Sequence, residues 1–149
     1  MIRQISIKTK FGWITAFEEK DKIIRVKFGK FKNILPSKNL KKFRYSLNNF
    51  FARKNKSFKF KYLLKGTTTQ KQIWRELNKI KFGNTKTYGE IAKKYKLSPR
   101  HVGKICAQNK LLLFIPCHRV IKSDGNLGGF SSVGGIKLKE KLLKFEQNF

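Results

Sequence analysis

The hydrophobic pattern of the chain changes its period at Gly-Thr-Thr-Thr, residues 66–69. Before this point, apolar and polar residues alternate at 5–11 and at 24–28, and a period of two is typical of half-buried β-strands. Beyond it, apolar residues recur every three or four positions, which is the spacing of one helix face. The 149 residues therefore divide into an N-terminal α/β domain, 1–66, and a mostly helical C-terminal domain, 67–149. The predicted fold class is α+β.

The N-terminal domain is predicted to combine antiparallel strands with one helix. A strand at 13–17 leads through the polar turn 18–22 into the alternating segment 24–28, an order that favours antiparallel pairing. Apolar residues at helical spacing predict a helix over 39–54, and a renewed alternation predicts a further strand over 58–62. The charged side chains of this domain are typical of a solvated face, and no group of its residues indicates catalysis.

The C-terminal domain is predicted to contain a helix-turn-helix. We expect Thr69 to cap a first helix that Phe82-Gly83 ends. A second helix covers 88–95, and a third follows a tight turn, with Ser98 as its N-cap and Pro99 at its first position. Two short helices joined by three or four residues form a helix-turn-helix pattern.

The chain carries far more basic than acidic residues. It has 36 Lys and Arg against 8 Asp and Glu, a formal net charge of +28. Such an excess indicates a polyanionic partner, because each neutralised phosphate releases counterions. Nucleic acid is favoured, and an acidic membrane surface is the alternative. No apolar run is long enough to span a membrane and no signal-peptide pattern is present, so we expect a cytoplasmic protein, associated with the nucleoid in a prokaryote, with free thiols.

The helix that follows Pro99 has a basic outer face, because its apolar and polar residues lie on opposite sides. A charged helix face is usually only solvated, but within a helix-turn-helix pattern it favours a surface that faces DNA. Cys106 lies on the apolar side and is interpreted as a small core residue. The outward residues are Arg100, Lys104 and Gln108, and the inward residues are Val102, Ile105 and Cys106.

A thiol stands beside an imidazole and a guanidinium in Pro-Cys-His-Arg-Val, residues 116–120. Cysteine reacts as its thiolate, and a neighbouring base and positive charge favour that form. Cys117 is therefore a candidate nucleophile, and a buried structural cysteine is the equal alternative. A zinc site is disfavoured, because the chain has only two cysteines and two histidines, without a second cysteine pair at ligand spacing. We expect no metal.

Two further features lie beyond this motif. Five glycines within 125–135 permit close approach of the backbone to a ligand, and an ordinary glycine-rich turn is the alternative. In the last helix, Glu146 falls inside the arc of apolar residues, with Lys139 near the same arc. A buried carboxylate requires a partner. A glutamate that orients an imidazole would complete a relay of cysteine, histidine and acid.

The residues from Thr69 to Glu146 resemble the O6-alkylguanine-DNA alkyltransferases, also called methylated-DNA–protein-cysteine methyltransferases. The Pro-Cys-His-Arg-Val motif carries the resemblance, and the N-terminal part is similar only in size and strand content. The resemblance implies a DNA repair enzyme that flips a damaged guanine out of the duplex and transfers its alkyl group to the cysteine, once per molecule and without a cofactor. It also implies O4-alkylthymine as a second substrate. The expected partner is double-stranded DNA containing alkylated guanine, bound by a monomer and without a membrane.

The same resemblance implies a role for each site residue. Cys117 is the alkyl acceptor, His118 is the base that deprotonates it through water, and Glu146 orients that base. Asn109 ties the recognition helix to the active-site turn, and Tyr88 rotates the phosphate and faces the flipped base. The expected DNA contacts are Arg100, which fills the gap left by the base, with Ser98, Lys104 and Arg119, and the expected pocket residues besides Tyr88 are Val120, Phe130 and Ser131.

Three departures from the family pattern are visible. Phe130 stands where many members have tyrosine, which removes a hydroxyl near the base, and the loop 131–135 is slightly longer than in some members. The N-terminal part has no Cys or His, so it cannot hold the zinc that some relatives bind. The alternatives are a damage sensor that binds alkylguanine without repair, which would lack the acceptor cysteine, and a helix-turn-helix regulator, which would not need Pro-Cys-His-Arg with a buried glutamate. A cysteine hydrolase is weaker still.

Overall fold

The computed structural model describes residues 1–54, 58–130, 132 and 134–147. By its contacts the chain forms two compact units: unit 1 comprises Met1–Lys65 and Lys110–Phe114, and unit 2 comprises Gly66–Asn109 and Ile115–Phe149. The segment Lys110–Phe114, which the sequence pattern places in the C-terminal domain, therefore belongs to unit 1. There the N–H of Val26 donates to the carbonyl of Lys110 (2.8 Å), and the N–H of Leu112 donates to the carbonyl of Val26 (3.2 Å).

Unit 1 is built on an antiparallel sheet of three strands in the order β1-β2-β3. These are β1 (Ile2–Thr9), β2 (Gly12–Glu19) and β3 (Lys22–Phe28). Two residues, Lys20 and Asp21, connect β2 to β3 with positive φ angles of 48° and 62°. That conformation matches the right-handed twist of a tight hairpin. The sequence prediction of antiparallel strands is confirmed.

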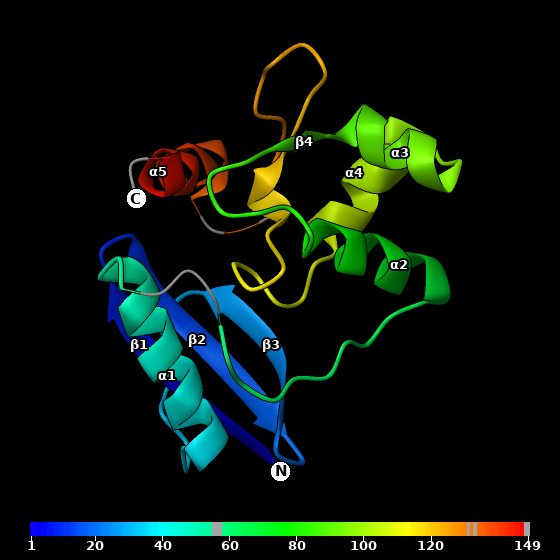
Figure 1. Cartoon of the computed structure of the whole chain (residues 1–149). Helices are drawn as coiled ribbons and strands as arrows, with labels where there is room; N and C mark the ends of the chain where they lie inside the picture. The colour runs from blue at the N-terminus through cyan, green and yellow to red at the C-terminus, as the bar shows by residue number, and fades with distance from the viewer. Residues whose placement is uncertain (55–57, 131, 133, 148–149) are drawn as a thin grey trace. The chain divides into compact units, whose positions relative to one another are not determined.

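Helix α1 (Lys38–Phe51) lies across one face of this sheet (Figure 1). Ser37 caps it, because its side chain accepts a hydrogen bond from the N–H of Leu40 at 3.1 Å. The predicted strand at 58–62 is wrong: it forms one isolated bridge, between Tyr62 and Ile23. The buried residues that join helix and sheet are Ile5, Ile7, Ile14, Val26, Leu40, Phe43, Leu47 and Phe50.

Unit 2 contains α2 (Thr68–Leu77), α3 (Tyr88–Tyr95), α4 (Pro99–Ala107) and α5 (Gly135–Gln147). The N-cap of α2 is Thr67, not the expected Thr69, because Thr67 forms a reciprocal capping box with Gln70. Helix α2 also ends earlier than expected, at Leu77. It packs against α4 through Trp74, whose buried indole N–H donates to the carbonyl of Ile105 (3.1 Å).

Helices α3 and α4 are joined by residues 96–98, which fits the expected helix-turn-helix. Lys96 ends α3 in the left-handed conformation, and Ser98 begins α4 by accepting a hydrogen bond from the N–H of His101 (3.0 Å). Within the described part of the chain, no helix combines the length and the hydropathy needed to cross a membrane.

A short parallel pairing positions the start of α3. Strand β4 (Lys86–Thr87) pairs with β5 (Val120–Ile121), and β5 directly follows the 3₁₀ turn η1 (Cys117–Arg119). Because Thr87 is both the last residue of β4 and the N-cap of α3, the pairing places Tyr88 beside η1.

The side chain of Asn39 connects three parts of unit 1. It is buried, donates to Glu18 Oε2 (3.0 Å) and to the carbonyl of Lys61 (2.9 Å), and accepts from the N–H of Lys61 (2.8 Å). Glu18 is itself 1% exposed. A buried polar group that loses its partner retains its desolvation cost, so this side chain holds together the start of α1, the end of β2 and the segment before Tyr62.

We predict that Asn39→Ala lowers the free energy of unfolding by about 2–4 kcal/mol, because the N–H of Lys61 and the carboxylate of Glu18 each lose a buried partner. Asn48→Ala is the matched control, since Asn48 is exposed on the same helix and should change stability by less than about 0.5 kcal/mol. Urea unfolding of both variants is the measurement. If both variants lost the same free energy of unfolding, the loss would come from replacing asparagine in the helix and not from the buried amide.

Candidate active site

The thiol of Cys117 is held inside unit 2. Cys117 begins η1, is 4% exposed, and is a free thiol, as is Cys106. The amide nitrogen of Asn109 donates to Cys117 Sγ (3.2 Å) and to the carbonyl of Ile115 (2.8 Å). Asn109 therefore fixes both the sulfur and the backbone that leads into the turn.

Burial raises the pKa of the Cys117 thiol, because a thiolate is poorly solvated there. The hydrogen bond from Asn109 and the charge of Lys139 act in the opposite direction. Burial also raises the pKa of Cys106, to about 12. The charge of Lys139 favours ionisation of both thiols, but among the described residues only the sulfur of Cys117 accepts a side-chain hydrogen bond, from Asn109.

His118 connects the thiol's own turn to helix α5. Its side chain is fully buried, and its Nε2 lies 2.8 Å from Glu146 Oε2. Burial lowers the pKa of His118, although Glu146 opposes that shift. The neutral ring therefore donates from Nε2 to the carboxylate, and its other nitrogen, Nδ1, is left as an acceptor. Nδ1 is buried and has no hydrogen-bond partner in the described part of the chain.

The carboxylate of Glu146 is shared between His118 and Arg119. Arg119 Nε donates to Glu146 Oε1 (2.8 Å) and Nη2 donates to Oε2 (2.9 Å). Burial disfavours ionisation of Glu146, but the hydrogen bonds from His118 and Arg119, together with the charge of Arg119, outweigh it and lower its pKa to about 2. Glu146 is therefore a carboxylate throughout the neutral range, which is the state that can stabilise a protonated imidazole.

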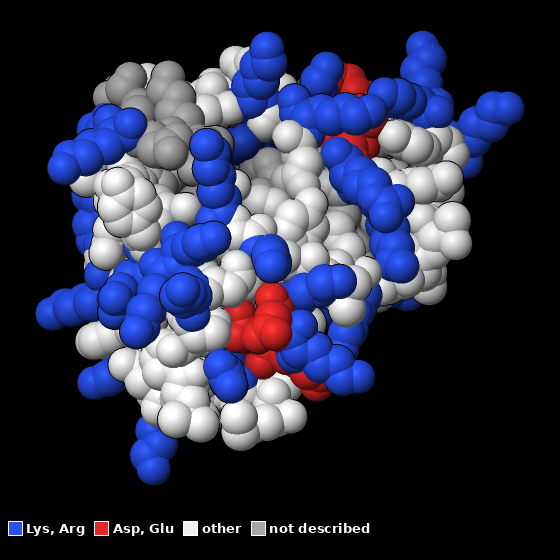
Figure 2. Space-filling model, turned by 60° about the horizontal axis from the view of Figure 1, so that its bottom comes forward, with Lys and Arg blue, Asp and Glu red and all other residues white. Residues whose placement is uncertain are grey.

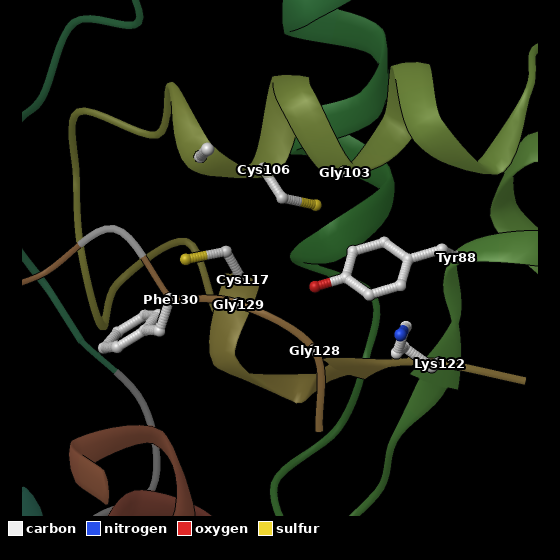
Figure 3. A pocket seen from close by; sticks show the side chains of 9 residues that line it. Tyr88, Gly103, Cys106, Cys117, Lys122, Gly128, Gly129 and Phe130 are labelled. Atoms are coloured by element: carbon white, nitrogen blue, oxygen red, sulfur yellow. The ribbon is translucent and has the colours of Figure 1, made fainter. Parts of the chain in front are cut away.

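A hollow of about 440 Å³ opens beside the Cys117 sulfur. This volume is within the usual range of small-molecule sites. Figure 3 shows the Tyr88 ring with its hydroxyl turned toward the two cysteines. Burial raises the pKa of Tyr88 to about 12, so its hydroxyl keeps its proton and can donate a hydrogen bond. The lining residues are Tyr88, Gly103, Cys106, Ala107, Cys117, Lys122, Gly128, Gly129 and Phe130.

Gly128 is required where the wall of the hollow meets Tyr88. Its φ is +76°, and an added Cβ would lie 3.1 Å from Tyr88 Cε2. A side chain would be strained there and would displace the ring. The glycine-rich segment is therefore a wall of this site.

Sequence reasoning gave no role to Lys139, which proves to be a central residue of the site. It is 0% exposed, and its ammonium donates to the carbonyls of Val120 (2.7 Å) and Leu127 (2.5 Å) and to the hydroxyl of Tyr88 (3.3 Å). Burial lowers the pKa of Lys139. Its place near the apolar arc of the last helix was the available signal, since a buried lysine requires several acceptors.

Known proteins of one family are similar to this chain. Residues 68–148 match the family model described as 6-O-methylguanine DNA methyltransferase, DNA binding domain. The methylated-DNA–protein-cysteine methyltransferase of Metallosphaera sedula is 35% identical over 149 residues, which cover 98% of this chain and 94% of that protein. The chain belongs to the methylated-DNA–protein-cysteine methyltransferase family. The Methanosarcina mazei member is 42% identical over 104 residues, 68% of this chain and 65% of that protein.

Solved structures of methyltransferases share the fold. The crystal structure of Mycobacterium tuberculosis O6-methylguanine methyltransferase has a TM-score of 0.85 at 28% identity, covering 99% of this chain and 94% of that chain. The M. tuberculosis protein has also been solved in complex with DNA, and that structure has a TM-score of 0.83 at 27% identity, covering 97% and 92% of the two chains. The α+β fold class is confirmed.

Two residues expected at the surface or pocket of this methyltransferase lie in its interior. Arg119, expected to contact DNA, is 8% exposed, and besides Glu146 it binds the carbonyl of Ile80 through Nη1 (2.7 Å). Its guanidinium is therefore engaged inside the protein. Val120, expected in the pocket, is 0% exposed and is absent from the lining. Ser131 lies outside the described residues.

The other expected DNA contacts of the methyltransferase lie at the surface of α4. Arg100 and Lys104 are exposed, and Ser98 is exposed although its hydroxyl caps the helix. Their contacts with DNA stay predictions. In the described part of the chain, no group of three or more His, Cys, Asp or Glu could hold a metal ion.

Proposed function

We propose that this methyltransferase repairs DNA by transferring an alkyl group from O6 of guanine to Cys117 Sγ, once per molecule. The observation that carries the proposal is the group of buried hydrogen-bonding side chains at the turn that holds the thiol. Asn109 holds the sulfur, His118 follows it in the same turn, and Glu146 holds the imidazole at 2.8 Å. A hollow of about 440 Å³ beside the sulfur has room for a base.

The chemistry follows from these groups. The thiol proton passes through a water molecule to Nδ1 of His118, the resulting thiolate attacks the alkyl carbon, and an S–C bond forms as the C–O6 bond breaks. The electron pair of that bond remains on the guanine, which takes up a proton from water, and the imidazolium of His118 returns its proton to water, so the proton lost by the thiol equals the proton gained by the base. Tyr88 keeps its own proton because burial raises its pKa to about 12, and it donates a hydrogen bond to the leaving base. Because the thioether is stable, the protein is consumed.

DNA binding and base flipping are assigned to the helix-turn-helix. The hollow lies inside unit 2, and a base within a duplex must leave the stack to reach a buried atom. Arg100 on α4 then fills the gap, and Ser98 and Lys104 contact the backbone.

O4-alkylthymine presents the same type of alkyl–oxygen bond and is proposed as a second substrate. All the proposed catalytic groups belong to unit 2 of one chain, so we propose a monomer that acts in the cytoplasm or nucleoid without a cofactor.

We predict that Cys117→Ser abolishes transfer and leaves DNA binding largely intact, because a serine hydroxyl is not ionised near neutral pH. Cys106→Ser is the matched control and should still accept the alkyl group. Mass spectrometry of peptides after mixing with O6-methylguanine duplex locates the label. Label on Cys106, or undiminished transfer by Cys117→Ser, would contradict the assignment.

We predict that Arg100→Ala slows repair of duplex DNA about tenfold or more, because the flipped state loses the side chain that replaces the base. Reaction with free O6-benzylguanine should be unchanged, since a free base needs no flipping. Lys104→Ala, on the exposed face of the same helix, serves as the control and should weaken binding without a separate effect on the rate at saturation. Equal slowing of the duplex and free-base reactions would place Arg100 in the chemistry or in folding.

We predict that Glu146→Gln shifts the pH profile of transfer to higher pH. A neutral amide cannot balance an imidazolium, so His118 becomes a weaker base and the apparent pKa of Cys117 rises. The variant should also lose about 3 kcal/mol of stability, because it leaves Arg119 buried without its carboxylate. In the parent protein, the pKa of Glu146 is lower when folded than when unfolded. The stability that its ionised form contributes is therefore present above about pH 4.5 and is lost as pH falls toward 2.

Arg119→Lys distinguishes the effect of Glu146 on the basicity of His118 from its effect on the stability of the fold. Lysine cannot bind the carboxylate through two parallel hydrogen bonds, so this variant should lose stability while it keeps the Glu146–His118 bond and the parental pH profile. The measurements are single-turnover rates across pH and urea unfolding. A parental profile in Glu146→Gln would mean that Glu146 supports only the fold.

A further inference from the structure

A second hollow lies in unit 1, remote in sequence from the proposed catalytic residues. Its volume is about 630 Å³, and α1 supplies most of its lining. The lining residue outside α1 is Lys59. Ser46 connects it to the helix, because the Ser46 hydroxyl accepts a hydrogen bond from the N–H of Lys59 (3.3 Å). The lining residues are Lys38, Lys41, Lys42, Tyr45, Ser46 and Lys59, all in unit 1.

The charge of the chain is concentrated in the part that holds this hollow. Residues 1–65 contain 19 Lys and Arg against three Asp and Glu, so they carry +16 of the total of +28. No Asp or Glu occurs between Asp21 and Glu76, a stretch with 17 Lys and Arg. Lys and Arg side chains spread over the face shown in Figure 2, where acidic side chains are few. The catalytic chemistry of unit 2 does not account for this concentration.

Within the part of the chain that the structure describes, the lysines of the hollow have no acidic partner. Lys38, Lys41, Lys42 and Lys59 are exposed, and none of them forms an ion pair within the described residues. Like charges gathered on one surface repel one another and destabilise the fold. A ligand with several negative charges would offset the repulsion among all four lysines, whereas a single small anion would offset only part of it.

The arrangement fits a chain of phosphates. Lys38 and Lys42, and likewise Lys41 and Tyr45, stand four positions apart on α1, so they form two rows along one helix face. Tyr45 is 70% exposed, and tyrosine hydroxyls, like lysine ammonium groups, are common donors to phosphate oxygens. We propose that this basic hollow of unit 1 is a second DNA-binding surface, which holds the sugar–phosphate backbone without regard to sequence or damage.

The test uses the full chain and undamaged DNA, so its outcome does not depend on alkyl transfer. The triple variant Lys38→Gln, Lys41→Gln, Lys42→Gln removes three charges from the hollow. The matched control, Lys8→Gln, Lys22→Gln, Lys32→Gln, removes three charges from exposed positions of unit 1 outside the hollow. Affinity for a short unmodified duplex is measured at several salt concentrations for both variants and the parent.

The slope of log affinity against log salt should become shallower by about 2–3 in the hollow variant, since each lost phosphate contact accounts for about 0.9. The control should change by less than about 1. Both variants should keep the circular dichroism spectrum and the urea unfolding midpoint of the parent, which shows that they are folded. Equal slope changes in the two variants would overturn the proposal, because net charge alone would then explain binding.

Reductive methylation of lysines, read by peptide mass spectrometry, gives a direct second measurement. DNA should protect Lys38, Lys41, Lys42 and Lys59, and it should leave Lys8 and Lys22 reactive. Vesicles of phosphatidylserine and phosphatidylcholine provide the other polyanion. If vesicles protect the four lysines and duplex DNA does not, the surface binds membrane and the proposal is wrong.

Discussion

The buried carboxylate of Glu146 is the constraint on which the active site depends. A charge with 3% exposure is tolerated only when its oxygens are paired and hydrogen-bonded. Two consecutive residues of η1, His118 and Arg119, meet this requirement from the same turn, and Arg119 also reaches the carbonyl of Ile80. The carboxylate therefore joins α5, η1 and the segment after α2. Cys117 precedes its two partners directly, so its sulfur is located by the same interaction.

Helix α5 organises the other wall of the site through a second buried charge. Lys139 lies seven residues before Glu146, and two helical turns bring both onto one face. Its ammonium gathers carbonyls from the strand after η1 and from the glycine-rich segment, together with the Tyr88 hydroxyl. One helix face thus carries a buried anion that holds His118 and Arg119 and a buried cation that holds Tyr88 and the glycine-rich segment. The active site is consequently sensitive to small rotations of α5.

Hydrophobic period predicted most of the elements but not where individual side chains go. The strands of unit 1, the helices of unit 2 and the buried position of Glu146 follow from spacing alone. The alternation at 58–62 predicted a strand, whereas Phe58, Phe60 and Tyr62 instead pack their rings on Phe114. Aromatic residues that pack on a long-range neighbour show the same period as a strand.

Arg119 and Lys139 show the same limit for charged residues. Lysine and arginine are usually at the surface, so composition did not single out Arg119 or Lys139 among the 36, and only the place of Lys139 near the apolar arc of the last helix was a signal. Their partners are carbonyls and a carboxylate from distant segments, and sequence spacing does not show which backbone groups the fold leaves unpaired. The pairing of Lys110–Phe114 with β3 is a long-range contact of the same kind.

Most of the few acidic residues take part in contacts within the fold, so they leave much of the positive surface unneutralised. Glu146 and Glu18 are buried with partners, and Glu76 accepts hydrogen bonds from Lys94 and Tyr95. Glu90 closes the capping box of α3, and the side chain of Asp124 accepts a hydrogen bond from the N–H of Asn126. Glu19, Glu76 and Glu140 do pair with exposed lysines, but these few pairs leave most of the 36 Lys and Arg without a carboxylate. Among the described residues, most of the positive charge therefore lies on exposed side chains that form no contact needed by the fold. This charge attracts any polyanion that approaches the surface.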